Sequence, residues 1–161
     1  MRSGRILRPH RLEAATMTTF DISVPGQASQ EAPSAARILC DAYGRRGSAA
    51  IRIGERADAI ALPGSFGAQV VSHLVRWMFT PVILRYPVPH GRWIFLTQPV
   101  TPASDLEEDE FVCARRLSPG AELVLPPGTV DGSPVKWVLA PDGEAPLPPW
   151  QAVLNAMRSA V

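Results

Sequence analysis

Apolar residues recur at helical spacing in three stretches of the chain. In residues 34–44 they lie three or four positions apart, Ser34 is suited to cap the first turn, and Gly44 or Gly47 to end the helix. A second helix is predicted over 65–78, where bulky apolar residues repeat every four positions: Phe66, Val70, Leu74 and Met78. A third closes the chain, with a face that we expect to be buried: Trp150, Val153, Leu154 and Met157.

Short runs of β-branched and aromatic residues fall between these helices. They predict strands over four ranges: 48–53, 56–63, 81–86 and 92–99. The first two flank a turn at Gly54, and the last two are joined by the proline-rich turn PVPHG. Near the C-terminal end, VLPPGTVDGSPVKWVLAP (124–141) is expected to form a stiff hairpin with a double-proline stop and a glycine-bearing turn.

The order of these elements is helix, strand pair, helix, strand pair, hairpin and helix, which indicates the α+β class. We expect a mixed β-sheet with helices packed on it, in a single domain over 34–161. A chain of 161 residues can bury about two thirds of its unfolded surface, so one hydrophobic core without disulfide or metal support is expected.

The composition excludes several classes of protein. Hydrophobic residues make up 46% and charged residues 19%, as in ordinary globular domains. The formal net charge of +1 provides no global field for holding nucleic acid. No apolar run reaches the roughly 18 residues of a membrane span, because His73 and Arg76 interrupt the best candidate. We therefore expect a cytoplasmic protein with no membrane partner.

Residues 1–33 are expected to form a flexible leader, since Ser, Thr, Gln and Pro dominate from 16 to 33 with little periodicity. Arginines recur at every third position from 2 to 11, but no apolar stretch follows them, so the segment is not a secretory signal. Two interpretations stay open. The segment is either a basic arm that contacts phosphates or the product of a start placed before the natural one at Met17.

Other candidate chemistry is sparse. Cys40 and Cys113 lie far apart and form no metal-ligand spacing, so we expect reduced, buried thiols. The acidic run DLEEDE (105–110) is interpreted as a hydrated loop or helix start in preference to a metal site, because metal-binding carboxylates are normally spread over rigid strands. The chain contains no nucleophile elbow, Walker A sequence, HExxH or CxxC.

Three segments resemble one known family. ADAIALPGSFG (57–67) looks like a strand that ends, in that family, in two carboxylates one residue apart, followed by proline and a glycine-containing helix start. GRWIFLTQP (91–99) looks like the family's glycine, histidine and aromatic strand. ELVLPPGTVDGSPVKWVLAPDGEAPLPPW (122–150) is similar to its proline-rich ending and is the most specific of the three.

Over residues 34–158 the chain thus resembles the N-terminal domain of bacterial and mobile-element bifunctional DNA primase/polymerases, in the archaeo-eukaryotic primase superfamily. The resemblance implies a primase/polymerase-like fold. It also implies polymerisation with divalent metal held by acidic side chains, which neutralise the oxygens of phosphoryl transfer.

At the metal site the chain departs from the family's pattern. Alignment on Pro63 places Ile60 and Leu62 where the two carboxylates belong, and neither side chain has an oxygen for Mg²⁺. Strand alternation puts Asp58 on the same face. Asp58 is either a residual acid near the former site, and then the weak candidate for a metal ligand, or, as we expect, a solvent-facing residue at the strand start. No catalytic residue, metal or cofactor is predicted.

The resemblance implies that four residues contact nucleic acid or a nucleotide. Trp93 stands where the family has a phosphate-contacting histidine, and it either stacks a base or, as alternation along the strand favours, fills the core. Arg85 and Arg92, on neighbouring strands, either meet phosphates or are ordinary exposed arginines of a sheet. Lys136, the only lysine, either reaches a phosphate from the loop that borders the family's cleft or is simply an exposed residue of a packed strand.

We therefore predict a catalytically degenerate primase/polymerase-like domain that acts as a DNA- or nucleotide-binding accessory module in replication or mobile-element biology. The alternative is a protein-interaction or regulatory module that keeps only the scaffold, as the near-neutral charge permits. A third hypothesis is an enzyme that draws its acids from Asp58 and the run at 105–110, and that would need Mg²⁺.

Overall fold

The computed structural model describes residues 32–44, 49–100 and 111–161. They belong to one unit, Glu31–Val161. The leader predicted over 1–33 lies outside the described residues except for its last two positions, and the acidic run at 105–110 lies outside them entirely.

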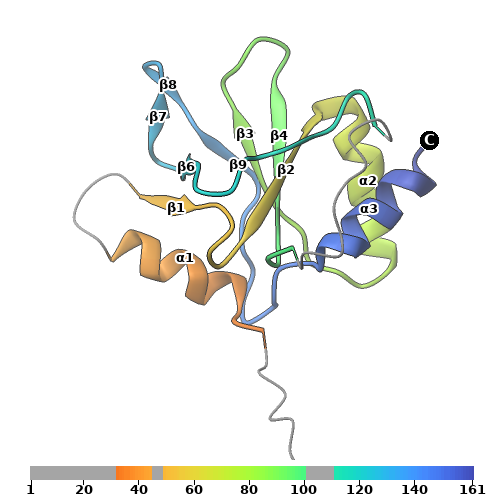
Figure 1. Cartoon of the computed structure of the whole chain (residues 1–161), viewed down its shortest axis with the longest axis horizontal. Helices are drawn as coiled ribbons and strands as arrows, with labels where there is room; N and C mark the ends of the chain where they lie inside the picture. Colours follow the sequence, from red (N-terminus) through yellow and green to blue (C-terminus); the bar gives the residue numbers. More distant parts are fainter. Residues whose placement is uncertain (1–31, 45–48, 101–110) are drawn as a thin grey trace, which may run out of the picture. The chain divides into compact units, whose positions relative to one another are not determined.

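The described residues form three helices and nine strands (Figure 1). The helices are α1 (Ala35–Tyr43), α2 (Gly64–Arg76) and α3 (Trp150–Ser159). The strands are β1 (Ala50–Arg52), β2 (Asp58–Pro63), β3 (Val82–Tyr86), β4 (Arg92–Thr97), β5 (Arg115–Arg116), β6 (Glu122–Val124), β7 (Thr129–Val130), β8 (Ser133–Pro134) and β9 (Lys136–Leu139). The three predicted helices and the four predicted strands before residue 100 are confirmed, with ends shifted by about two residues.

The central sheet has five strands in the order β5-β2-β4-β3-β9, and each neighbouring pair is antiparallel. The two-stranded sheets β1-β6 and β7-β8 are also antiparallel. Among the described residues, parallel pairing occurs at one place, the isolated bridge between Ile53 and Ala57. With helices packed on this sheet, the predicted α+β class is confirmed.

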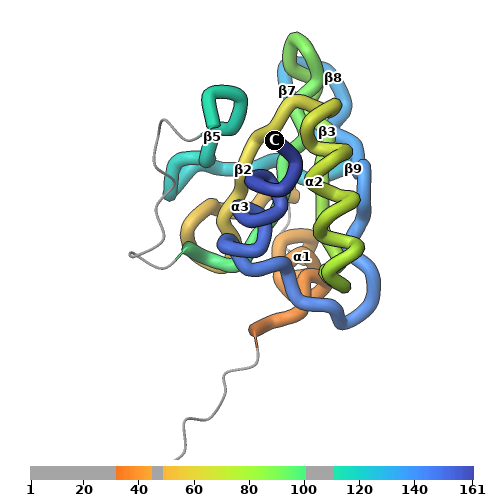
Figure 2. Tube along the Cα trace, turned by 90° about the vertical axis from the view of Figure 1, so that its right-hand side faces the viewer, coloured from red at the N-terminus to blue at the C-terminus, as the bar shows by residue number. Residues whose placement is uncertain are grey.

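A hydrophobic cluster lies on each face of the central sheet, so the expectation of one core is wrong. Side chains alternate along β2, where Ala59 and Ala61 join a cluster with α1, β1 and β6, while Ile60 and Leu62 join a second cluster with α2 and α3. Figure 1 shows α1 on one side and the α2/α3 pair on the other, and Figure 2 shows α2 and α3 running alongside each other. Because covers lie on both faces, β2 is buried over almost its whole length.

Two predicted pairings are wrong. The strands on either side of Gly54 do not pair with each other, because the positive φ of 88° at Gly54 begins a turn that sends β1 to β6 and β2 into the central sheet. The segment 124–141 is not one hairpin either. β6 pairs with β1, β9 pairs with β3, and only the short β7-β8 hairpin closes locally, around Asp131 and Gly132. Both turn residues have positive φ, 50° and 75°, as a type I′ turn requires.

Two tyrosines hold the double-proline segment that follows β6. The hydroxyl of Tyr43 on α1 donates to the carbonyl oxygen of Pro126 at 2.6 Å, and that of Tyr86 on β3 donates to Val124 at 2.9 Å. Burial raises the pKa of Tyr86 to about 12, although the hydrogen bond to Val124 acts against the shift. The end of β6 is therefore fixed to the central sheet, and the proline segment after it is fixed to α1.

Both cysteines are free and exposed, so the expectation of buried thiols is wrong. Cys40 follows Leu39 on α1 and points away from the buried face of that helix, which is formed by Ala35, Ile38, Leu39 and Ala42. Each helix in the described part of the chain is too short or too polar to cross a membrane.

Candidate functional site

Ile60 and Leu62, where the resembled family has its carboxylates, are fully buried at 0% exposure. Ile60 lies opposite Phe95 and Leu62 opposite Trp93 in the β2-β4 ladder, and both pack in the α2/α3 cluster. A divalent cation would have no oxygen ligand at these positions and would have to enter a packed hydrophobic layer.

Asp58 is buried at 1% exposure, so the expectation of a solvent-facing residue is wrong. One carboxylate oxygen accepts a hydrogen bond from the backbone N–H of Val100 at 2.7 Å, and the other lies 3.3 Å from the Arg116 guanidinium. The Arg116 guanidinium also lies 5.4 Å from the ring centroid of Trp150 on α3. Both carboxylate oxygens of Asp58 therefore have a hydrogen-bonding or charged partner within the domain.

The described residues around Asp58 form no group of metal ligands. Among residues 32–44, 49–100 and 111–161, no three His, Cys, Asp or Glu side chains gather in a group that could hold a metal ion. As the alternation rule predicts, Asp58 does share the face of Ile60 and Leu62, since Arg116 lies opposite Ile60 in the β2-β5 ladder.

Three of the four predicted contact residues form a row across the sheet. Trp93 on β4 lies opposite Arg85 on β3, and Arg85 lies opposite Lys136 on β9. Directly opposite residues share one face and lie about 5 Å apart. On β2, the other neighbour of β4, Leu62 lies opposite Trp93. The row of paired residues therefore runs from the part of this sheet face that α2 and α3 cover to the part that they leave uncovered.

Trp93 packs against the start of α2. A Cβ added to Gly64 would lie 3.1 Å from the indole nitrogen, and one added to Gly67 would lie 2.9 Å from the ring carbon Cε3. Because the two glycines let the helix approach the indole this closely, Trp93 is half-buried and fills space between β4 and α2. The interpretation of Trp93 as a core residue is supported, while one part of it lines the pocket described next.

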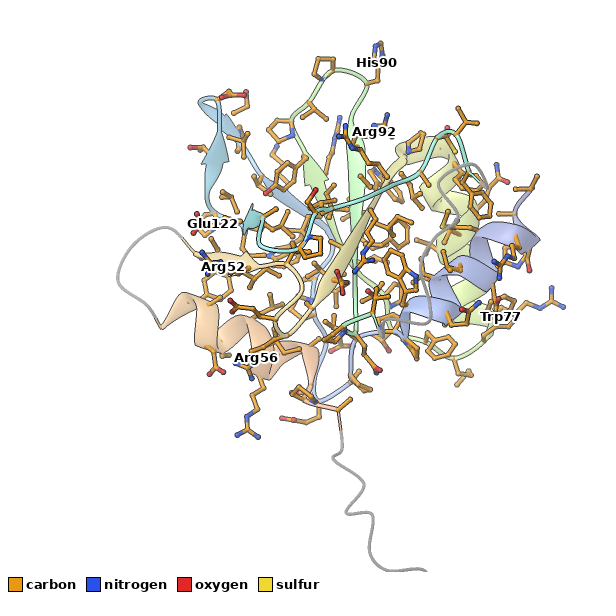
Figure 3. All side chains as sticks on the ribbon, in the orientation of Figure 1. Arg52, Arg56, Trp77, His90, Arg92 and Glu122 are labelled. Carbon is orange, nitrogen blue, oxygen red and sulfur yellow. The ribbon has the colours of Figure 1, made fainter. Side chains whose placement is uncertain are left out.

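An open pocket of about 730 Å³ lies at this end of the sheet. Its walls come from the β2-α2 junction, the ends of β3 and β4 and the turn between them: Pro63, Gly64, Ser65, Arg85, Tyr86, Pro87, Val88, His90, Gly91 and Trp93. The Arg85 guanidinium passes within 3.9 Å of the place where a Cβ on Gly91 would stand. His90 stands exposed at the tip of the turn, with a positive φ of 71° (Figure 3).

The charges beside the pocket are positive. Arg85 and Lys136 are exposed, and within the part of the chain that the structure describes neither has a carboxylate within 4.0 Å. Two like charges directly opposite each other in a sheet are unfavourable without a counterion. An anion bound between the two side chains would remove this repulsion, and a guanidinium suits the geometry of a phosphate.

Arg92 does not join this row. It lies opposite Tyr86 and Pro63 and so faces the other side of the sheet from Trp93, and its guanidinium donates to the carbonyl oxygen of Cys113 at 2.8 Å. Arg92 therefore anchors the segment that precedes β5.

Sequence reasoning missed two parts of the site. A proline before a glycine-containing helix start marks Gly64 and Ser65 in the sequence, but this pattern by itself does not predict that they line a pocket. The partner of Asp58, Arg116, could not be found, because the two residues are 58 positions apart and only the β2-β5 ladder brings them together.

Comparison with known proteins adds no relative. No family model, no curated protein and no solved structure matches the chain. The resemblance to primase/polymerase domains therefore stays a prediction.

Proposed function

We propose that this domain is a binding module for single-stranded DNA or a free nucleotide, built on a primase/polymerase-like scaffold that has lost phosphoryl transfer. The observation that carries the proposal is the row of Trp93, Arg85 and Lys136 beside the open pocket. The two cations hold a phosphate group, and the pocket accepts the sugar or the base attached to it. A role in replication or in mobile-element biology rests on the resemblance alone.

The charge distribution supports a local phosphate site. With a net charge of +1 the whole chain does not attract a polyanion at long range, so affinity has to come from adjacent cations. Arg85 and Lys136 are such a pair. Each contact between a cation and a phosphate of a single strand contributes about 0.7 to the slope of log affinity against log salt, so a site of this size predicts weak binding that falls clearly with salt.

The absence of carboxylates at the family's metal positions supports a binding role in place of catalysis. Ile60 and Leu62 provide no oxygen ligand, and the neighbouring Asp58 is engaged by Val100 and Arg116. Metal-assisted phosphoryl transfer needs at least one bound cation to neutralise the attacking and leaving oxygens. With the described residues, this face binds a nucleotide or DNA but does not position a metal ion that would activate it for phosphoryl transfer.

Fluorescence anisotropy tests the proposal with three labelled probes: a 20-nucleotide single strand, the matching duplex and a nucleoside triphosphate. We expect salt-sensitive binding of the single strand or of the triphosphate. The variant Arg85→Ala/Lys136→Ala is expected to weaken that binding and, for the single strand, to lower the salt slope by about 0.7 for each cation removed. The matched control is Arg76→Ala, an exposed arginine at the other end of α2, which we expect to leave affinity unchanged.

Two results would overturn the proposal. One is the lack of any binding by the three probes at low salt. The other is binding that the double variant and Arg76→Ala reduce to the same extent, because the row on the sheet would then have no particular role.

A further inference from the structure

The turn between β3 and β4 places a histidine where glycine is usual. The backbone N–H of Gly91 donates to the carbonyl oxygen of Val88 at 2.9 Å, Pro89 takes the second position of the turn, and His90 takes the third with a φ of 71°. This is a type II β-turn, whose third residue needs a positive φ and is usually glycine or asparagine. The backbone conformation therefore costs more free energy with histidine than with glycine.

The same turn holds His90 at the rim of the open pocket. Pro87 and Pro89 fix two φ angles of the loop, and His90, Gly91 and Arg85 contribute to the pocket wall. Nε and Nη2 of Arg85 lie 3.8 and 3.9 Å from the place where a Cβ on Gly91 would stand, so the guanidinium reaches the residue next to His90. A costly backbone conformation at the rim of a candidate site points to a use for the side chain that it carries.

The fold gives the His90 side chain no partner. Within the described residues its imidazole is exposed, makes no hydrogen bond and has no carboxylate within 4.0 Å (Figure 3). The residues that line the pocket from the start of α2 are uncharged, and Arg92 faces the other side of the sheet. The charged groups nearest to His90 in the described part of the chain are thus Arg85 and, opposite Arg85, Lys136. Both are cations, so an anion is the ligand that suits all three side chains.

Of the titratable residues in the pocket wall, His90 is the one that changes its charge near neutral pH. The others are Arg85 and Tyr86. An arginine keeps its proton in proteins. Burial raises the pKa of Tyr86 to about 12, so that its hydroxyl stays neutral. Histidine is the side chain that ordinarily gains or loses a charge between pH 5 and 8.

We propose that His90 is a third cationic contact of the phosphate site and that binding there is coupled to the uptake of one proton by its imidazole. The inference rests on the proposed function, in which Arg85 and Lys136 hold the phosphate. The imidazolium donates a charge-assisted hydrogen bond to an oxygen of the ligand, whereas the neutral imidazole offers one N–H and no charge. The site therefore holds a phosphate more tightly as the pH falls.

The sign of this pH effect follows from linkage. A phosphate beside the imidazole favours its charged form, so the complex keeps the proton up to a higher pH than the free protein does. The added affinity is complete below the titration midpoint of the free protein and is lost as the pH rises through the midpoint of the complex. Because an exposed pair of opposite charges contributes modestly, we expect binding about three- to fivefold tighter at pH 5.5 than at pH 8.

Fluorescence anisotropy at low salt measures this dependence with a rhodamine-labelled strand of 20 thymidylates that lacks a terminal phosphate. Its phosphodiesters and bases keep their charge between pH 5.5 and 8, so a change of affinity in this range belongs to the protein. If the domain binds the nucleoside triphosphate and not the strand, the triphosphate serves as the probe, because its own titration is common to the wild type and to each variant.

Two substitutions at His90 separate charge from shape. His90→Asn removes the titrating group and keeps a residue that accepts the left-handed conformation, so we expect wild-type affinity at pH 8 and no gain at pH 5.5. His90→Lys supplies a permanent charge and is expected to bind about three- to fivefold more tightly than the wild type at pH 8, with little dependence on pH. The matched controls His10→Gln and His73→Gln, at the other two histidines of the chain, should retain the pH dependence.

NMR of the imidazole ¹⁵N nuclei gives a second measure of the same coupling. In the complex the titration midpoint of His90 should rise by about 0.5–0.7 pH units, which is the logarithm of the three- to fivefold change in affinity. The midpoint of His73, at the other end of α2, should stay where it is in the free protein.

The possible failures of this inference and of the proposed function are distinguishable. Suppose that binding depends on Arg85 and Lys136, but that its pH dependence is equal in the wild type and His90→Asn, or that the midpoint of His90 does not move. The role of His90 would then be overturned and the proposed function would stand. A lack of binding by every probe at low salt, at pH 5.5 as well as at pH 8, would overturn both.

Discussion

The carboxylate of Asp58 lies 3.3 Å from the guanidinium of Arg116, across 58 positions of sequence. The Asp58 side chain is almost inaccessible, and Arg116 covers it from β5 while its guanidinium also faces the ring of Trp150. The pair thus connects β2, the edge strand β5 and α3 next to the positions where the resembled family binds metal. The Asp58 carboxylate at this place therefore has a structural role.

Loss of Arg116 should destabilise the domain. Arg116→Ala leaves the buried carboxylate of Asp58 without its charged partner, and we expect the free energy of unfolding to fall by roughly 3 kcal/mol. The matched control is Arg115→Ala, the exposed neighbour on the same strand, for which a change within about 0.5 kcal/mol is expected. Urea denaturation at pH 7 measures both, and equal losses for the two variants would contradict the structural role of the pair.

The chain should not extend a primer. With Ile60 and Leu62 buried and both oxygens of Asp58 engaged, Mg²⁺ or Mn²⁺ has no ligand set on the described part of this face. A labelled primer on a template, incubated with all four deoxynucleoside triphosphates and either metal, is expected to keep its length. Metal-dependent extension that Asp58→Asn abolishes would instead establish the enzyme hypothesis.

The close approach of α2 to Trp93 should make Gly67 intolerant of a side chain. In Gly67→Ala the new methyl group would lie 2.9 Å from Trp93 Cε3 and 3.3 Å from Phe95 Cε2, so we expect a loss of about 1–3 kcal/mol in thermal unfolding experiments. Gly44→Ala is the control, because φ there is −70° and the nearest atom to the new methyl is 3.5 Å away. It should be neutral or stabilising by up to about 1 kcal/mol.

Tyr86 should make stability depend on pH in the alkaline range. Its pKa is about 12 in the folded chain and about 10 when unfolded, so below pH 10 both states hold the proton. Between pH 10 and 12 only the unfolded state releases it, and the free energy of unfolding decreases. In Tyr86→Phe that part of the decrease should vanish, while stability at pH 7 falls by about 1 kcal/mol through loss of the hydrogen bond to Val124.

Urea titrations at several pH values compare the two proteins, and the Tyr43 hydroxyl, whose pKa burial also raises, contributes to the slope in both. Identical alkaline slopes for the wild type and Tyr86→Phe would refute the assignment.

Met78→Gly should stabilise the domain. Glycine adopts the left-handed conformation without the steric cost that a methionine bears there, and a side chain that is 90% exposed has few contacts to lose. We expect a gain of roughly 1 kcal/mol, or a rise of about 3–5 °C in the midpoint of thermal unfolding measured by calorimetry. A lower midpoint would mean that the Met78 side chain supports the fold and would contradict the prediction.

The sequence by itself determined the elements that depend on local chemistry. The apolar spacing of α1, α2 and α3, the cap at Ser34 and the runs of β-branched residues in β3 and β4 reflect preferences that act within a few residues. Strand alternation also placed Asp58, Ile60 and Leu62 on one face correctly.

Only the tertiary structure decided which strands pair, and pairing decides the site. The ladders β1-β6 and β3-β9 join segments distant in sequence, so nothing local distinguishes them from the hairpins that the turns at Gly54 and Gly132 indicated. The β3-β9 ladder brings Arg85 beside Lys136, the β3-β4 ladder turns Arg92 to the other face from Trp93, and the β2-β5 ladder brings Arg116 to the buried Asp58. These contacts depend on long-range packing, which minimises exposed apolar surface over the whole chain at once.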